Sequence, residues 1–266
     1  MATLQFLSIS GRPVAAMSYL LYCIVDGNVE EPPEKQGFPL LPPVSILVRT
    51  AGLGAVVSEN PAPTVDRDVG RLLAYAEMIE CYNWERTVIP MRYGCIFSRL
   101  HEIRCLLESR QREYRRILSE VEGSVEMSAR VAFDEPPSFT TSRNEGSLSR
   151  RLTELVDGAA RGPGTVYLAK RSVHYSLRQV SAMRSEEIRK SICDATEGQY
   201  LKCTSGVDAQ GGKAKLAVHF LVPREGVGKF VSALQPLSMR YGGALEVTGP
   251  WPPYNFVCSP ESGLLH

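Results

Sequence analysis

The chain has 266 residues, of which 44% are hydrophobic and 22% are charged, a balance typical of a globular protein with one or two domains. Its formal net charge of +1 provides no general attraction for nucleic acid or anionic lipid. No apolar run is long enough to span a bilayer, and Met1 to Leu7 lacks the pattern of a secretory signal, so we expect neither. Seven cysteines without a C-x-x-C pair indicate reduced thiols and a cytoplasmic protein.

The first elements of the chain predict part of a sheet. Ser18 to Val25 is apolar and rich in strand-forming residues, so we expect a buried strand there. A proline-rich loop follows at 26–43. Two further strands, 44–50 and 53–58, flank Ala51-Gly52, which is a plausible hairpin turn.

Two helices and two more strands are expected before the midpoint. Thr64 is a candidate N-cap for the first helix, and 87–91 predicts a short strand. The second helix should span 98–123, and its interleaved arginines and glutamates favour a solvated face with i,i+4 pairs over a nucleic-acid face. Val125 to Phe133 alternates apolar and polar residues, which predicts a half-exposed strand. Helical spacing assigns these buried faces: Val65, Val69, Leu72, Leu73, Ala76 and Ile79, then Leu100, Ile103, Leu107, Tyr114, Ile117 and Val121.

The second half predicts a separate domain. The stretch before residue 147 holds Pro136-Pro137, then Ser, Thr, Asn and Gly, with little apolar content. We therefore expect an N-terminal α+β domain over 1–135, a linker over 136–146 and a C-terminal domain over 147–266. Beyond the linker we expect the following: a short helix over 147–156, an ambiguous segment at 165–169, helices over 173–196 and 224–234, and strands over 200–205, 215–222 and 244–248. This order, (β)αββαβ, is that of a ferredoxin-like sandwich. The predicted class is α+β, with two antiparallel sheets that each carry helices on one face.

No pattern of catalysis stands out. The four histidines share no metal-ligand spacing, and no phosphate-loop, dinucleotide-binding or nucleophile-elbow motif occurs. Cys95 is the most tempting nucleophile and His219 the most tempting base, but a buried thiol and a structural histidine are the commoner interpretations. The last domain also lacks the aromatic run with which such sheets stack RNA bases. We therefore expect no catalytic residue, metal or cofactor, and no nucleic-acid or membrane partner.

Two segments are more informative. The first is Pro90-Met91-Arg92-Tyr93-Gly94, in which Pro90 ends a strand and Gly94 permits a positive φ. The second is Gly249-Pro250-Trp251-Pro252-Pro253-Tyr254-Asn255-Phe256, in which three prolines stiffen a track that carries three aromatic side chains. Arg92 either fastens a turn in its own domain or contacts another domain or a partner. Trp251 either fills a domain interface or contacts a partner.

With these segments the chain resembles the gas vesicle protein F/L family. P-M-R-Y-G-C-I-F before a long helix and G-P-W-P-P-Y-N-F after the last strand carry the resemblance, and the SYLLYCIV, LGAVVS and V-E-M-S-A-R-V stretches support it over residues 18–257. The resemblance implies an accessory protein of gas vesicle formation without enzymatic activity, located in the cytoplasm or on the vesicle. It implies a minor vesicle component or assembly factor that contacts the hydrophobic shell protein and other accessory proteins. It leaves these motif positions as structural or partner-binding candidates: Pro90, Arg92, Tyr93, Gly94, Gly249, Pro250, Trp251, Pro252, Pro253, Tyr254 and Phe256.

Elementary physical chemistry agrees with such a role. A shell built from an apolar subunit requires helpers that shield it before polymerisation, since exposed apolar patches aggregate. Rigid aromatic anchors are suited to such transient contacts, because a few residues carry most of the binding energy. The alternative from another class is a cytosolic enzyme on a ferredoxin-like scaffold that uses Cys95 or His219.

Overall fold

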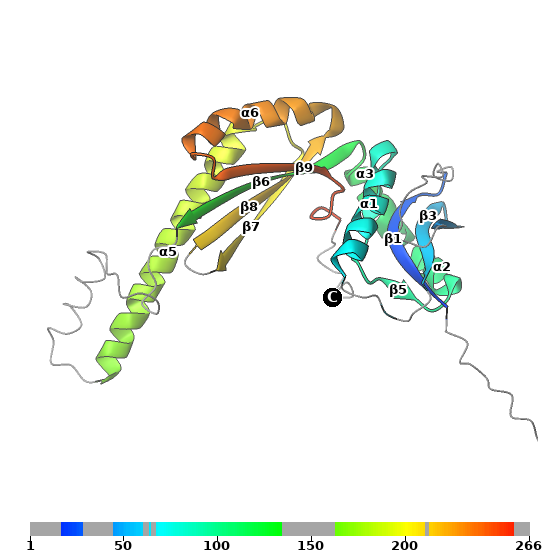
Figure 1. The fold of residues 1–266 in the computed structure, drawn as a ribbon, viewed down its shortest axis with the longest axis horizontal. Coiled ribbons are helices and arrows are strands. Elements are labelled where there is room, and N and C mark those ends of the chain that lie inside the picture. Colours follow the sequence, from blue (N-terminus) through cyan, green and yellow to red (C-terminus); the bar gives the residue numbers. More distant parts are fainter. Residues whose placement is uncertain are drawn as a thin grey trace, which may run out of the picture. The chain divides into compact units, whose positions relative to one another are not determined.

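The computed structural model describes residues 17–28, 45–60, 64, 68–134, 163–210 and 213–257. Two compact units are present, and their elements are labelled in Figure 1. The first unit contains the described residues up to Gly123 together with those from Pro252 onward, and the second spans Ser124–Trp251. Within the described residues, no helix combines the length and the apolar character needed to cross a membrane.

These units do not coincide with the predicted boundaries at 135 and 147. Strand β6 (Ser124–Asp134), which we placed at the end of the N-terminal domain, pairs with β8 (Lys213–Pro223) and β9 (Leu245–Trp251) of the second sheet. Residues 252–257, which we placed in the C-terminal domain, belong to the first unit. The alternation of apolar residues predicts a strand but not its partner strands, so β6 was assigned to the wrong sheet. The predicted linker and the helix at 147–156 lie outside the described residues.

The first unit is built on an antiparallel sheet with strand order β2-β3-β1-β4, and β5 also pairs with β1. Its strands are β1 (Ser18–Asp26), β2 (Ser45–Thr50), β3 (Leu53–Asn60), β4 (Ile89–Pro90) and β5 (Ile96–Phe97). The predicted hairpin is confirmed, because β2 pairs with β3 around Ala51 and Gly52. These two residues have φ of 52° and 69°, as the favoured two-residue hairpin turns require.

Helix α1 (Val69–Glu85) covers the first sheet with a face that differs from the predicted one. Its N-cap is Asp68 rather than Thr64, and the Asp68 carboxylate accepts a hydrogen bond from the Arg71 backbone N–H at 3.0 Å. The residues of α1 that are buried in one cluster with the sheet are Tyr75, Ile79 and Tyr82. Three residues expected in the core are exposed instead: Val69, Leu72 and Leu73. Ile79 is buried as predicted. The prediction failed for the other three because α1 is apolar on more than one face, and spacing alone does not say which face meets the sheet.

Helices cover both faces of this first sheet, where one covered face was expected. Leu47 of β2 packs against the cluster that contains α1. Successive side chains in a strand point to opposite faces, so Thr50, three residues on, lies on the other face. Its hydroxyl donates to the Glu108 carboxylate at 2.8 Å, and Glu108 belongs to α2 (Leu100–Ser109). The α+β class with two antiparallel sheets is confirmed, and the middle of the first sheet is buried from both sides.

The single helix predicted for 98–123 is two helices, α2 and α3 (Gln111–Glu120). Arg110 separates them, with φ −111° and ψ 18°. The expected i,i+4 pairing occurs, for example between Arg116 and Glu120 at 2.8 Å. Most of the predicted apolar stripe is buried: Ile103, Leu107, Tyr114, Ile117 and Val121.

The second unit has the predicted ferredoxin-like topology, with strand order β7-β8-β6-β9. Its other elements are α5 (Pro163–Ala195), β7 (Lys202–Gln210), the short 3₁₀ helix η1 (Arg224–Gly226) and α6 (Val227–Arg240). The ambiguous segment 165–169 is part of α5, which continues beyond the end of the sheet (Figure 1), and β6 is the first strand of the motif. Both helices pack on one face of the sheet through these buried side chains: Ile188, Ile192, Phe230 and Leu234 against Met127, Val131, Val218 and Phe220.

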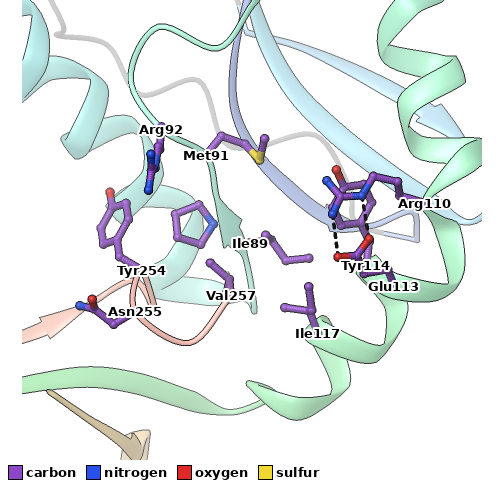
Figure 2. A pocket seen from close by; sticks show the side chains of 11 residues that line it. Ile89, Met91, Arg92, Arg110, Glu113, Tyr114, Ile117, Tyr254, Asn255 and Val257 are labelled. Atoms are coloured by element: carbon purple, nitrogen blue, oxygen red, sulfur yellow. Dashed lines mark hydrogen bonds and ion pairs between the residues drawn. The ribbon is translucent and has the colours of Figure 1, made fainter. Parts of the chain in front are cut away.

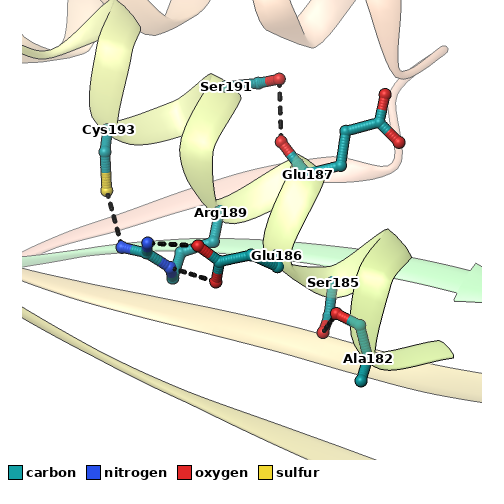
Figure 3. A network of polar contacts seen from close by, with 7 residues as sticks. All are labelled: Ala182, Ser185, Glu186, Glu187, Arg189, Ser191 and Cys193. Atoms are coloured by element: carbon teal, nitrogen blue, oxygen red, sulfur yellow. Dashed lines mark hydrogen bonds and ion pairs between the residues drawn. The ribbon is translucent and has the colours of Figure 1, made fainter. Parts of the chain in front are cut away.

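Helix α5 carries polar contacts between neighbouring turns (Figure 3). Arg189 donates to both carboxylate oxygens of Glu186, at 2.7 Å from Nε and 2.5 Å from Nη2. Its Nη1 lies 3.8 Å from the Cys193 Sγ. Burial raises the pKa of Cys193 and the nearby Cys203 adds to the rise, so this thiol is protonated at neutral pH. Exposed ion pairs contribute roughly 0–1 kcal/mol, so we expect this network to order the helix surface rather than to stabilise the fold.

Candidate partner-binding site

The first motif forms a loop that is fastened to the edge of the first sheet. β4 precedes the loop and β5 follows it, and both pair with β1. At its start, the Met91 backbone N–H donates to the Tyr22 carbonyl at 2.8 Å. The Cys95 N–H then donates to the Arg92 carbonyl at 3.2 Å and closes a turn, in which Gly94 has φ 96°. The loop ends are therefore fixed, and the exposed Arg92 side chain lies within the turn.

Tyr75 of α1 holds this loop, and no sequence pattern singled it out. Its hydroxyl donates to the Leu21 carbonyl at 2.8 Å and lies 3.0 Å and 3.1 Å from the Met91 and Arg92 carbonyl oxygens. Its ring packs between Tyr22 and Tyr93, with centroids 4.9 Å and 5.1 Å away. Burial raises the pKa of Tyr75, so its hydroxyl remains a donor. Tyr93 is thus part of the packing that supports the loop.

The second motif is divided between the two units. Gly249, Pro250 and Trp251, which we expected after the last strand, are the end of β9. Gly249 has φ 121°, and its bond to Pro250 is cis. A Cβ at Gly249 would lie 2.7 Å from the Glu126 carbonyl oxygen, so glycine is required where the register between β6 and β9 shifts. The Trp251 side chain is 40% exposed.

The rest of the second motif turns tightly within the first unit. Pro252 and Pro253 are buried. The Tyr254 N–H donates to the Pro252 carbonyl at 2.8 Å, and the Phe256 N–H donates to the Pro253 carbonyl at 3.1 Å. These two bonds fix the direction of the following side chains, of which Val257 is buried while Tyr254 is partly exposed.

The two motifs meet in a pocket of the first unit, about 240 Å³ in volume (Figure 2). Three segments line it: Ile89 to Arg92, one face of α3, and the turn after Pro253. The apolar lining is formed by Ile89, Pro90, Met91, Tyr114, Ile117 and Val257, and the polar lining by Arg92, Arg110, Glu113, Tyr254 and Asn255. Sites for small molecules are commonly about 300–1,000 Å³, so this pocket is sized for one or two side chains of a partner segment.

The charges of the pocket are unbalanced. Arg110 and Glu113 neutralise each other through two hydrogen bonds of 2.7 Å, drawn in Figure 2. The Arg110 guanidinium also lies over the Tyr114 ring, 5.2 Å from its centroid. Arg92 forms no ion pair with any residue in the part of the chain that the structure describes. Among the residues that the structure describes, the positive charge of Arg92 at the pocket rim is therefore not compensated.

A buried hydroxyl in the pocket lacks a well-aligned hydrogen bond. Tyr114 is 3% exposed, and its hydroxyl makes no hydrogen bond of good geometry with the described residues, although the Arg110 guanidinium lies beside it. Burial raises the pKa of Tyr114 although the Arg110 guanidinium opposes the rise, so the hydroxyl is a donor at neutral pH. A buried polar group without a partner costs roughly 1–3 kcal/mol. An incoming carbonyl or carboxylate oxygen would remove that cost.

The residues of the enzyme alternative lack a catalytic setting. Burial raises the pKa of Cys95 to about 11, so its thiol is protonated at neutral pH. His219 lies in the other unit, and its Nδ1 is 2.8 Å from the Ser128 hydroxyl and 3.2 Å from the Glu126 carboxylate. In a catalytic triad, one ring nitrogen of the histidine contacts the hydroxyl of the nucleophile and the other contacts the carboxylate. Here Nδ1 of His219 contacts both groups. Within the described ranges, no group of three His, Cys, Asp or Glu residues is arranged to hold a metal ion.

The fold and the pocket define an α+β protein that joins a ferredoxin-like unit to a second sheet bearing a pocket of side-chain size. The chain belongs to the gas vesicle synthesis protein GvpL/GvpF family, whose model matches residues 18–258. The resemblance inferred from the two motifs is thereby confirmed.

Relatives and solved structures agree with this assignment. The chain is 28% identical over 246 residues to gas vesicle protein F of Streptomyces sp. (strain CB03234), covering 91% of this chain and 100% of the relative. It is 25% identical over 210 residues to gas vesicle protein F1 of Halobacterium salinarum, covering 77% of each. Crystal structures of GvpF from Microcystis aeruginosa and Anabaena sp. PCC7120 share the fold, with TM-scores of 0.73 and 0.69 at 13% and 16% identity. Each of these two structural comparisons covers 91% of this chain; they cover 99% of the Microcystis structure and 97% of the Anabaena structure.

Proposed function

We propose that this chain is an accessory protein that assists gas vesicle formation by binding other vesicle proteins. Membership of the GvpL/GvpF family supports a role in gas vesicle formation. The finer proposal is a minor vesicle component or assembly factor, in the cytoplasm or on the vesicle, that contacts the hydrophobic shell protein and other accessory proteins. It acts through preformed surface rather than through chemistry.

The observation that carries this proposal is the pocket where the two motifs meet. Its apolar lining accepts an apolar side chain. Arg92 has no ion pair and the Tyr114 hydroxyl no well-aligned hydrogen bond among the described residues, so both favour a neighbouring carboxylate or carbonyl oxygen. Burying one large apolar side chain contributes roughly 1.5–3 kcal/mol, and a hydrogen bond to a charged group contributes roughly 1.5–3 kcal/mol. Together these amount to about a 10²- to 10⁴-fold gain in affinity.

Reversing the charge of Arg92 tests the role of the pocket. Arg92→Glu should weaken binding to the shell subunit or to a co-encoded accessory protein by tenfold or more, because the rim would then repel a carboxylate. Quantitative pull-downs with purified proteins, together with vesicle yield in producing cells, measure the effect. Arg104→Glu is the matched control, since Arg104 is also an exposed arginine and belongs to α2 outside the pocket. Wild-type binding and vesicle yield in the Arg92→Glu protein would contradict the role of the pocket.

The enzyme alternative is tested by removing its two residues together. A Cys95→Ala, His219→Gln protein should still support buoyancy in cells that make vesicles, because neither side chain has a catalytic setting. Its amount of folded protein must match that of the wild type. Loss of vesicles at normal protein level would favour the enzyme instead.

A further inference from the structure

Helix α1 has a second apolar face that the fold of its own unit does not use. Four large apolar side chains of this helix point to solvent: Val69, Leu72, Leu73 and Trp84 are 69%, 47%, 59% and 73% exposed. At 100° per residue they fall within an arc of about 120°, which adjoins the buried face at Ile79. These side chains span about 22 Å along the helix, the length of a partner helix of four turns, and Glu77 and Glu80 lie between Leu73 and Trp84.

An apolar strip of this kind requires an occupant. Single exposed apolar residues are common on protein surfaces, but contiguous ones mark sites of interaction. A helix that is apolar on two faces is ordinarily covered on both, and among the described residues α1 packs on its sheet through Tyr75, Ile79 and Tyr82. The exposed face therefore resembles half of an interface.

The charges on this face indicate what the occupant carries. Glu80 lies on the same arc as the apolar strip and Glu77 lies about 20° beyond its edge, and neither forms an ion pair in the described part of the chain. Burial and the Glu77 carboxylate both raise the pKa of Glu80, so the two like charges are close enough to repel each other. A cation placed between them would relieve this repulsion.

We propose that the outer face of α1, defined by Val69, Leu72, Leu73, Glu77, Glu80 and Trp84, is a docking surface for a basic amphipathic helix of a partner protein. Apolar side chains of that helix cover the strip, and its lysines or arginines meet the two glutamates. The surface is separate from the pocket in its residues and in the chemistry it recognises. It adds a second contact to the proposed function but does not depend on the pocket.

Two other occupants fit the surface less well. A second copy of the chain on a two-fold axis would bring Glu77 and Glu80 against the same carboxylates of its partner. An anionic lipid surface would be repelled by both glutamates. A basic helix satisfies the apolar strip and the acidic charges at once, as in other helix-on-groove contacts.

Trp84 provides a direct signal for a test. The chain has two tryptophans, so in a Trp251→Phe background the fluorescence reports Trp84 alone. The probe is a synthetic 18-residue amphipathic helix of leucine and lysine, and the control peptide replaces every lysine by glutamate. The leucine–lysine peptide should shift the Trp84 emission to the blue and saturate, and the leucine–glutamate peptide should not. Leu72→Ser with Leu73→Ser should weaken binding at least tenfold, and Glu77→Gln with Glu80→Gln should remove most of its salt dependence.

A matched control separates this surface from general apolar adhesion. Val180→Ser with Met183→Ser removes two comparably exposed apolar side chains from α5 and should leave the titration unchanged. Equal binding of both peptides, equal weakening by the α5 variant, or no shift with either peptide would overturn the proposal. A shift of Trp84 with protein concentration or with lipid vesicles, in the absence of peptide, would assign the surface to a second copy or to a membrane instead. The Arg92→Glu test uses partner proteins rather than this probe, so the two proposals fail independently.

Discussion

Removing one hydroxyl group should loosen the loop of the first motif. The Tyr75 hydroxyl donates to the Leu21 carbonyl at 2.8 Å and is within 3.1 Å of two carbonyl oxygens of the loop. Tyr75→Phe keeps the ring and its packing but leaves buried carbonyl oxygens without this donor. A lost hydrogen bond costs about 0.5–1.5 kcal/mol, and an unsatisfied buried group costs roughly 1–3 kcal/mol. We therefore expect the first unit to lose about 1–3 kcal/mol of its free energy of unfolding.

Hydrogen exchange followed by mass spectrometry measures this loss locally. A loss of that size lowers the protection of the most protected amides in the first unit by about 5- to 150-fold. The amide of Met91, which donates to Tyr22 beside this hydroxyl, should lose protection most clearly. The second unit should keep its exchange rates, because the hydroxyl contacts only residues of the first unit.

Tyr19→Phe is the matched control, since Tyr19 is a half-buried tyrosine of the same sheet. It should change the free energy of unfolding by less than about 0.5 kcal/mol. Equal protection of Met91 in the Tyr75→Phe protein and in this control would refute the assignment of Tyr75 as the residue that holds the loop.

Two further predictions concern backbone and thiol chemistry. Gly249→Ala should destabilise the second unit by about 1–3 kcal/mol, because a Cβ would strain the backbone and approach the Glu126 carbonyl. In calorimetry its unfolding temperature should fall several degrees below that of Gly242→Ala, whose site is open, and equal melting would contradict this. Cys95, with its pKa raised to about 11, should react with iodoacetamide at pH 8 far more slowly than the exposed Cys105. The reaction rate of Cys95 should rise about tenfold with each pH unit until the pH reaches that pKa. Peptide mapping measures both rates, and equal labelling of the two in the folded protein would show that Cys95 is not shielded.

Short-range patterns in the sequence determined the local structure. The apolar run at Ser18, the hairpin at Ala51-Gly52 and the stripe along α2 and α3 were all predictable, because each depends on residues a few positions apart. The order of strands and helices in the second half also predicted the ferredoxin-like topology. The two motifs indicated the family, since stiff aromatic and proline-rich segments of this kind are unusual in sequence.

Tertiary structure alone decided how those pieces are combined. β6 has the pattern of a strand in either sheet, and its pairing with β8 and β9 follows from contacts over about a hundred residues of sequence that no local pattern encodes. α1 is apolar on two faces, so its choice to bury Tyr75 rather than Leu72 depended on the shape of the sheet beneath it. The pocket joins Arg92 to Tyr254, which are far apart in the chain, because the turn after Pro252 packs within the first unit. Propensity and periodicity act over one or two turns, whereas packing of long-range neighbours selects among the arrangements that local patterns allow.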